Sequence, residues 1–366
     1  MANLFYFWQK FLSKDRLEKK ENSNAKFAFI IHPRVSARDD MGRVFWLFKY
    51  FPEKILLKLI SFLPPIARGK VIFLPEKKLV GWIIVVPLTA EQFLSFPKNF
   101  ILKKLIHALE KAKKLGAKIV GLGEFVASVT KGGEELVGKV PGIFIDNGKA
   151  LTAAVTLKAI EQICEIKKIN LTDEKIAIVG AGGSIGRGIA LCLTEENIPL
   201  ILIEKPKKII ELEEIFSFYK KKIITSDMSA LKEAKIVVVA TAATEQIIKS
   251  EFLKENAIVY DLTQPRNTSS DILKKRSDVI IIDGGIIDTP VFDFGMDIGL
   301  KKHQAYACLT ESLICALENL NENLVGYSTP KDIKKMLSLF ERYQNYFKLN
   351  IFQSFGKPLN EKLEPI

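Results

Sequence analysis

A glycine-rich turn between a strand and a helix constrains this chain more than any other feature of its sequence. The apolar run 175–179 (KIAIV) predicts a buried strand, and residues 185–193 have the spacing of a helix. Between them, residues 180–186 read GAGGSIG. Glycine has no Cβ, so such a turn lets an anion approach the backbone amides at the start of the helix. The pattern predicts the opening strand, turn and helix of a Rossmann-type domain that binds a nicotinamide dinucleotide.

The glycines of this turn have the spacing GxxGxxG rather than the strict GxGxxG, because Ile185 stands where the stricter pattern has its third glycine. The strand before the turn and the helix after it still make the dinucleotide interpretation much stronger than a bare motif match. The candidate cofactor-binding residues of the turn are Gly180, Gly182, Gly183, Ser184, Ile185 and Gly186.

An acidic residue follows the second predicted strand of this domain. Glu204 comes directly after the apolar run 199–203, 24 residues beyond Gly180. A carboxylate at this place normally binds the ribose hydroxyls of NAD and would repel the 2′-phosphate of NADP. However, Lys205 follows at once, with two more lysines at 207 and 208, and these cations could hold that phosphate. We expect NADPH as the cofactor, with NAD as the alternative.

Four further strands are predicted in the same domain, at 223–224, 236–240, 257–261 and 279–283. Apolar runs of this kind, separated by helical stretches, favour a parallel sheet that is buried on both faces. Ligands of such sheets bind at the carboxyl ends of the strands. Thr241 and Thr263 follow two of these runs, so both are candidates for the cofactor site. The turn 263–266 either lines the nicotinamide pocket or only connects two elements.

The first half of the chain also alternates strands and helices, and a length of 366 residues favours two domains. Strands are predicted at 26–31, 80–86 and 117–122, and helices at 100–115 and 150–168. The expected fold class is therefore α/β, with two domains. We expect an N-terminal segment 1–24, an α/β substrate domain with a connector helix at 25–170, a Rossmann domain at 171–300 and C-terminal helices at 301–366.

Composition limits the partners of the chain. The net charge of +12 favours an acidic partner, such as nucleic acid, anionic lipid or an acidic carrier protein. The sequence contains no nucleic-acid motif and no zinc-ligand spacing, so we expect neither nucleic acid nor a metal. The four cysteines, none of them in a CxxC pair, are typical of a reduced, cytoplasmic protein.

The first twenty residues could touch a membrane without crossing it. No apolar run in the chain reaches the roughly 18 residues that a membrane span needs. The segment does carry apolar residues at helical spacing, with basic residues between them: Leu4, Phe5, Phe7, Lys10, Phe11 and Lys14. Such a helix either lies on a membrane surface or packs on its own protein.

The order of several motifs resembles the cyanobacterial-type long-chain acyl-[acyl-carrier-protein] reductases and their unassigned bacterial relatives. Together the matching motifs cover the chain from about residue 115 onward, and the first hundred residues match only weakly. The motifs are VGLG at 120–123, the connector 148–161, VGAGGSIG at 179–186, DGG at 283–285 and QAYACLTE at 304–311.

The resemblance implies that the chain uses NADPH to reduce a fatty acyl thioester, carried by acyl carrier protein or coenzyme A, to an aldehyde. It also implies that Cys308, in the segment QAYACLTE, is the nucleophile that takes up the acyl group. The chain departs from the family at two places. Lys149 stands where the family has Asn after the connector glycine, and Lys205, preceded by Glu204, stands where it has Arg.

Two further side chains are candidates for proton transfer. His303 lies five residues before Cys308 on a helix predicted from 301 to 320, and it could assist the thiol or protonate an oxyanion. Lys149 lies at the expected domain junction and could act as a general acid. The remaining cysteines and histidines are expected to be structural: Cys164, Cys192, Cys315, His32 and His107.

Two other functions remain open from the sequence. The chain could be a hydroxy-acid or amino-acid dehydrogenase of similar two-domain build, with Lys149 as the acid and Cys308 inert. It could also be a non-catalytic protein that uses the fold to bind a dinucleotide.

Overall fold

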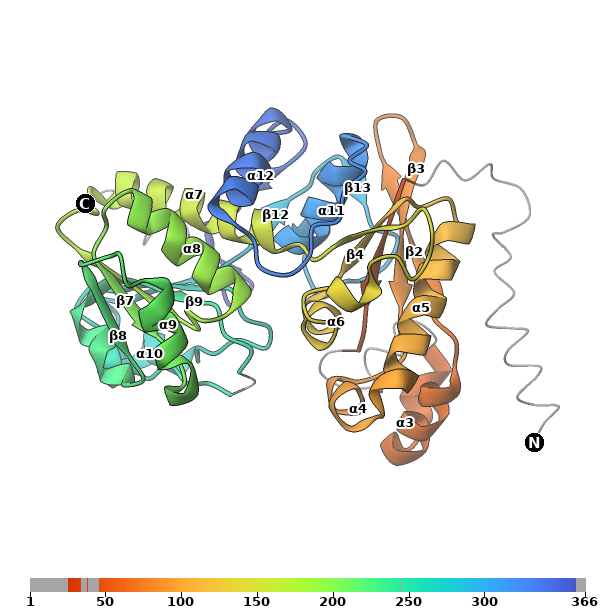
Figure 1. Cartoon of the computed structure of the whole chain (residues 1–366), viewed down its shortest axis with the longest axis horizontal. Coiled ribbons are helices and arrows are strands. Elements are labelled where there is room, and N and C mark those ends of the chain that lie inside the picture. Colours follow the sequence, from red (N-terminus) through yellow and green to blue (C-terminus); the bar gives the residue numbers. More distant parts are fainter. Residues whose placement is uncertain (1–25, 34–37, 39–45, 244, 360–366) are drawn as a thin grey trace. The chain divides into compact units, whose positions relative to one another are not determined.

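The computed structural model describes residues 26–33, 38, 46–243 and 245–359, and the chain divides into two compact units (Figure 1). Unit 1 comprises residues 1–148 and 289–326, and unit 2 comprises 149–288 and 327–366. This division differs from the expected ranges in two respects. The helix expected as a connector belongs to unit 2, and the segment expected as C-terminal helices is shared between both units. The N-terminal segment 1–24 lies outside the described residues.

A six-stranded mixed sheet forms the centre of unit 1, in the order β13-β2-β3-β1-β4-β5. Strands β3, β1, β4 and β5 run parallel to one another. At one edge, β2 pairs antiparallel with β3 and β13 pairs antiparallel with β2. The three strands expected here are confirmed. Strand β2 was not expected, because Arg68 and Lys70 interrupt its apolar run. The strands are β1 (Phe27–Ile31), β2 (Ile66–Phe73), β3 (Lys78–Val85), β4 (Ile119–Leu122), β5 (Phe144–Asp146) and β13 (Phe292–Asp293).

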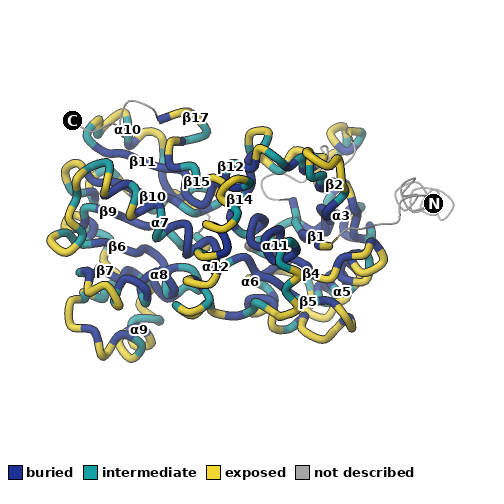
Figure 2. The backbone as a smooth tube through the Cα atoms, turned by 90° about the horizontal axis from the view of Figure 1, so that it is seen from above, coloured by how far each residue is buried: buried dark blue, intermediate teal, exposed yellow. Residues whose placement is uncertain are grey.

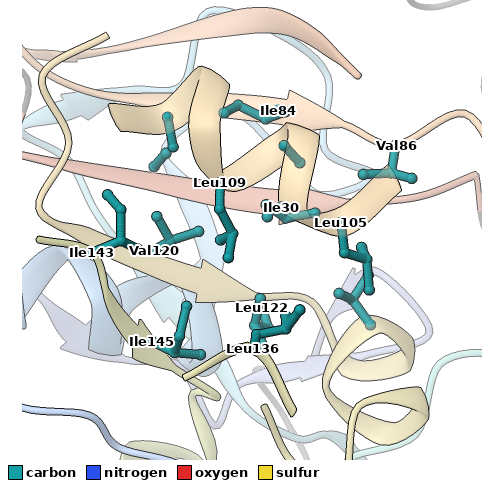
Figure 3. Packing of buried hydrophobic residues seen from close by; sticks show 14 of the residues in the cluster. Ile30, Ile84, Val86, Leu105, Leu109, Val120, Leu122, Leu136, Ile143 and Ile145 are labelled. Atoms are coloured by element: carbon teal, nitrogen blue, oxygen red, sulfur yellow. The ribbon is translucent and has the colours of Figure 1, made fainter. Parts of the chain in front are cut away.

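Helices cover this sheet and close its core. Leu105 and Leu109 of α5 pack over Ile30, Val120 and their neighbours (Figure 3). Helix α11 contacts β1 and β4. The helices are α3 (Glu53–Phe62), α4 (Ala90–Ser95), α5 (Lys98–Lys114), α6 (Glu124–Val129) and α11 (Ala307–Leu317), with 3-10 turns η1 (Trp46–Tyr50) and η2 (Glu134–Leu136). The unit also includes the short strand β14 (Gln304–Tyr306).

The sheet of unit 2 has six parallel strands in the order β11-β10-β9-β6-β7-β8. Read from β6, this is the doubly wound strand order of a Rossmann fold, so the predicted fold class is confirmed. All six strands lie where the apolar runs predicted them, and the central ones are buried (Figure 2). They are β6 (Lys175–Val179), β7 (Leu200–Ile203), β8 (Lys222–Thr225), β9 (Ala234–Val239), β10 (Ile258–Asp261) and β11 (Ile280–Asp283).

Helix α7 is the most deeply packed helix of unit 2. It contacts both α8 and α12 and buries residues around most of its circumference. The helices are α7 (Lys149–Lys167), α8 (Ser184–Glu195), α9 (Ile209–Ile215), α10 (Asp271–Lys275) and α12 (Pro330–Arg342), with 3-10 turns η3 (Pro206–Lys208), η4 (Met228–Glu233) and η5 (Ser250–Phe252). The short strands are β12 (Ile286–Asp288), β15 (Lys348–Leu349), β16 (Gln353–Ser354) and β17 (Lys357–Pro358).

A buried carboxylate shapes the turn that follows β10. Asp261 is 2% exposed, and its two oxygens accept hydrogen bonds from the backbone N–H and the hydroxyl of both Thr263 and Thr268, at 2.6–3.0 Å. These four bonds compensate the removal of the carboxylate from water. They fix the loop at the carboxyl end of the strand, where the fold class places its ligand.

We expect Asp261→Ala to destabilise the sheet of unit 2 by about 3 kcal/mol or more, because it leaves buried donors without an acceptor. Native-state hydrogen exchange of the β9 and β10 amides measures this change. Asp227→Ala is the matched control: Asp227 accepts the same pair of bonds from Ser229, but at an exposed position. A cost there equal to that of Asp261→Ala would contradict the prediction.

Candidate functional site

The glycine turn of unit 2 brings the backbone of three segments together. Gly180 has a φ of 88°, and a Cβ on it would lie 2.6 Å from the carbonyl oxygen of Ala240. A Cβ on Gly186 would lie 2.4 Å from the oxygen of Gly180. Helix α8 begins at Ser184 without a capping side chain at Gly183. The start of the helix therefore keeps its amides available for an anion.

Gly183 differs from the other two glycines of the motif. Its φ of −78° and ψ of 162° suit any residue. A Cβ there would lie 3.1 Å from the oxygen of Gly180 and 3.5 Å from that of Ala240, its nearest neighbours. A residue with a Cβ therefore fits at this position with little steric strain. The first two residues of the helix, Ser184 and Ile185, are half-buried behind it.

Glu204 is bound to the glycine turn. Its Oε2 accepts a hydrogen bond from the backbone N–H of Gly182 at 3.0 Å, and its Oε1 accepts one from the N–H of Lys205 at 2.9 Å. The ammonium of Lys208 donates to the carbonyl of Gly182 at 3.1 Å. Lys205 and Lys207 are exposed. The region beside the turn therefore holds one carboxylate anchored by two amides and two lysines that face solvent.

The two threonines predicted for this site lie at the carboxyl edge of the sheet. Thr241 follows β9 next to the turn, since a Cβ on Gly180 would lie 2.9 Å from its Cα. Its hydroxyl oxygen accepts from the N–H of Ala243 at 3.2 Å. Thr263 is buried, donates to Asp261 and accepts from the N–H of Asn267 at 2.8 Å. Thr263 thus shapes the loop after β10.

In unit 1, the side chains of two consecutive residues at the end of β5 hold separate segments of chain together. Asp146 accepts from the hydroxyl of Ser312 on α11 at 2.5 Å and from the N–H of Gly148 at 3.0 Å. The side-chain amide of Asn147 donates to the carbonyls of Gly132 and Gly326 at 3.0 and 3.1 Å. The end of β5 is therefore tied to α11 and to two loops.

Gly148 lies directly against the backbone of Cys308. Its φ is 68°, and a Cβ at this position would lie 2.3 Å from the Cβ of Cys308 and 2.4 Å from its Cα. Only glycine permits this approach. Cys308 is the second residue of α11 and half-buried. The amide dipoles at a helix start favour negative charge, and Cys308 lies within this first turn.

The other three cysteines are buried, as expected for packing residues. Burial raises the pKa of the thiols of Cys164 and Cys192 to about 11 in each case. Both groups therefore stay protonated at neutral pH. Cys315 lies seven residues beyond Cys308 on α11 and is 1% exposed. Cys308 is the cysteine with access to solvent.

Two carboxyl groups meet behind Cys308. Asp146 is 1% exposed and Glu311 is fully buried, and a hydrogen bond joins their side chains. Burial raises the pKa of Asp146 to about 6, although hydrogen bonds from Ser312, Gly148 and Glu311 oppose that rise. Asp146 therefore stays protonated to a higher pH than an exposed aspartate does.

The remaining predicted residues lie elsewhere. His303 was expected on the same helix as Cys308, but it lies before that helix, because the segment 304–306 forms β14 and α11 begins only at Ala307. Its φ is 61°, and its ring nitrogen Nδ1 lies 3.0 Å from the carbonyl oxygen of Phe292. Lys149 begins α7 and is half-buried. It belongs to unit 2, whereas Cys308 belongs to unit 1.

Sequence reasoning missed Asp146, Asn147 and Ser312. The first two form a polar pair between a strand and a glycine, DNG at 146–148, which is a pattern of turns in which the side chain binds the backbone two residues on. That signal could have indicated a bond from Asp146 to Gly148. It could not have indicated Ser312, which is 166 residues away in the sequence.

Comparisons with known proteins agree with the architecture of unit 2. Residues 161–283 match the family model of shikimate/quinate 5-dehydrogenases. The chain is 31% identical over 253 residues to the aminotransferase PigE of a Serratia species. This match covers 66% of this chain and 29% of PigE. It is 23% identical over 252 residues to the long-chain acyl-[acyl-carrier-protein] reductase of Synechococcus elongatus, covering 65% of this chain and 73% of that protein.

Similar solved structures include L-tryptophan dehydrogenase from Nostoc punctiforme, with a TM-score of 0.41 and 13% identity over 87% of this chain and 81% of that one. Another is the malic enzyme of Pyrococcus horikoshii, with a TM-score of 0.43 and 16% identity over 94% of this chain and 76% of that one.

Within the described part of the chain, no helix combines the length and the apolar character that a membrane span requires. Unit 2 is a nicotinamide-dinucleotide-binding domain with the strand order of a Rossmann fold.

Proposed function

We propose that this protein reduces a fatty acyl thioester to an aldehyde through an acyl group carried on Cys308. The observation that carries the proposal is the position of Cys308, at the start of α11 with its backbone against Gly148. The similarity to the Synechococcus long-chain acyl-[acyl-carrier-protein] reductase supports the same chemistry. The chain is also similar to PigE, but it spans less than a third of that protein, so PigE contributes nothing to this proposal.

In this proposal the thiolate of Cys308 attacks the carbonyl carbon of the thioester. The carbon–sulfur bond to the carrier breaks, the carrier thiolate leaves and takes up a proton, and the acyl group remains on Cys308. When bound, the dinucleotide supplies the hydride that reduces this carbon. Release of the aldehyde then restores the Cys308 thiolate. Each turnover consumes one proton, which matches the one acquired by the leaving thiol.

The buried pair of Asp146 and Glu311 supports this chemistry as a positioning element. Asp146 fixes Gly148 on one side and Ser312 on the other, so it holds the start of α11 at the end of β5. Both carboxyl groups are buried, so neither touches the substrate.

We further propose NADPH as the cofactor. Both oxygens of Glu204 are engaged by backbone amides, and the exposed ammonium groups of Lys205 and Lys207 flank the same turn. In this proposal these lysines bind the 2′-phosphate of NADPH. The acyl donor is a thioester of acyl carrier protein or of coenzyme A, because both are anionic and the chain carries a net charge of +12.

A dehydrogenase that acts on a small hydroxy or amino acid is the second candidate. The match of residues 161–283 to shikimate/quinate 5-dehydrogenases supports it. In such an enzyme Lys149, at the start of α7, would serve as the general acid and Cys308 would be inert. Turnover of such an acid, unaffected by removal of the Cys308 thiol, would distinguish it from the thioester reductase.

The cofactor turn is tested by Gly183→Val. Because the protein backbone suits any residue at this position, the variant should fold, while its side chain occupies the space that the pyrophosphate needs. We expect NADPH binding at least about tenfold weaker, or about 1.4 kcal/mol, measured by fluorescence titration. The wild type should bind NADPH more tightly than NADH. A folded variant with unchanged affinity would remove the turn from the cofactor site.

The nucleophile is tested by Cys308→Ser, which keeps the shape of the side chain but replaces a good nucleophile with a poor one. We expect aldehyde formation to fall at least about a thousandfold with cofactor binding retained. Wild-type protein given acyl donor without cofactor should gain one acyl group on Cys308, detected by intact-mass and peptide mass spectrometry. Cys315→Ala, on the same helix, should keep most activity. Near wild-type aldehyde formation by Cys308→Ser would refute the mechanism.

The buried carboxyl pair gives a dependence of stability on pH. The pKa of Asp146 is raised from 3.8 to about 6, so its protonated form stabilises unit 1 fully below pH 4. That contribution is lost as the pH rises through about 6. Asp146→Asn cannot titrate, so it should remove this part of the loss. Hydrogen exchange of the β4 and β5 amides at pH 4 and pH 7 compares the two proteins. Equal losses in both would show that Asp146 does not titrate in this range.

A further inference from the structure

The segment 46–62 of unit 1 exposes an unusual number of large apolar side chains. It comprises η1 and α3, and the exposed fractions are 62% for Trp46, 77% for Tyr50, 57% for Ile55 and 61% for Phe62. The rings of Trp46 and Tyr50 contact each other edge to face, with centroids 6.0 Å apart. Single exposed apolar residues are common on protein surfaces, but a short segment with four of them indicates an interaction surface.

Helix α3 is apolar on both of its faces. Leu56 and Ile60 are fully buried and pack with Phe48 in a core cluster of unit 1. The opposite face carries Ile55 and Phe62, which are exposed. Among the described residues, no side chain covers Ile55 and Phe62, and exposed apolar groups of this size favour contact with another surface.

Basic side chains stand among these apolar ones. Lys49, Lys54 and Lys58 are exposed, while Glu53 is the single acidic residue of the segment. Tryptophan and tyrosine are enriched at the level of lipid headgroups, and lysine extends its charge outward while its stem lies on apolar surface. Protein–protein interfaces also favour aromatic residues, but they are depleted of lysine. The combination thus fits an anionic lipid surface better than a protein partner.

We propose that the segment 46–62 is a membrane-docking surface, which binds a bilayer containing anionic lipid. The apolar side chains enter the boundary between headgroups and acyl chains, and the lysines meet the headgroup phosphates. Helix α4 lies beside α3 (Figure 1), and the side-chain amide of Gln92 donates to the carbonyl of Leu57 at 2.9 Å. Leu94 of α4 is a further exposed apolar side chain, at 75%. This contact is independent of the reaction proposed above.

The test is sedimentation of the full chain with vesicles of phosphatidylcholine, alone or mixed with phosphatidylserine. We expect binding to the mixed vesicles that weakens as salt is added. Trp46→Ser with Phe62→Ser should lower the partition coefficient at least about tenfold, since two large apolar groups no longer enter the bilayer. Lys54→Gln with Lys58→Gln should lower it about fivefold for each charge removed.

A matched control comes from unit 2, where Ile210 and Phe218 are 74% and 65% exposed outside the proposed surface. Ile210→Ser with Phe218→Ser should leave vesicle binding unchanged, and thermal unfolding should show every variant folded. Failure of the wild type to bind mixed vesicles would overturn the proposal. So would unchanged binding by the Trp46 and Phe62 variant, because the contact would then lie elsewhere, for example in residues 1–20. A dimer that this variant loses, without any vesicle binding, would assign the surface to a second copy.

Discussion

The hydrogen bonds of one buried carboxyl group hold the candidate cysteine site together. Asp146 ends β5, and its oxygens join the turn at Gly148 to Ser312 on α11, so that the helix with Cys308 begins where the strand ends. A buried carboxylate without these donors would cost several kcal/mol, on the order of what a whole domain gains on folding. These hydrogen bonds of Asp146 fix the turn at Gly148 and the start of α11, which carries Cys308 and Glu311.

The two candidate sites share one structural arrangement, a close glycine contact at the start of a helix. In unit 2, the glycine turn at the end of β6 leads into the start of α8, where backbone amides point outward. In unit 1, the backbone at Gly148 packs against the start of α11, where Cys308 lies. A helix start favours negative charge, which we propose to be a diphosphate in unit 2 and the Cys308 thiolate in unit 1. Glycine is required at both because the chain passes closer than a Cβ allows.

The sequence predicted what depends on neighbouring residues and missed what depends on distant ones. The strands of unit 2 are continuous apolar runs because both faces of the sheet are buried, and the glycine turn is a local signal. Strand β2 was missed because its polar residues hide the apolar run, and β14 because three residues carry no period. The bond between Asp146 and Ser312 joins residues far apart in the chain, which no spacing reveals. The surface at 46–62 appears only once the buried face of α3 is known.

The division of the chain has a consequence for its synthesis. Neither unit is a continuous stretch of sequence, since the chain passes between them after residues 148, 288 and 326. On the ribosome, all six strands of the unit 2 sheet emerge before α11. Until α11 is made, unit 1 lacks the helix that contacts β1 and β4. Cys308 enters its surroundings only after the whole sheet of unit 2 has been made. No single cut of the gene separates the two units, and a fragment that ends before residue 307 lacks the thiol altogether.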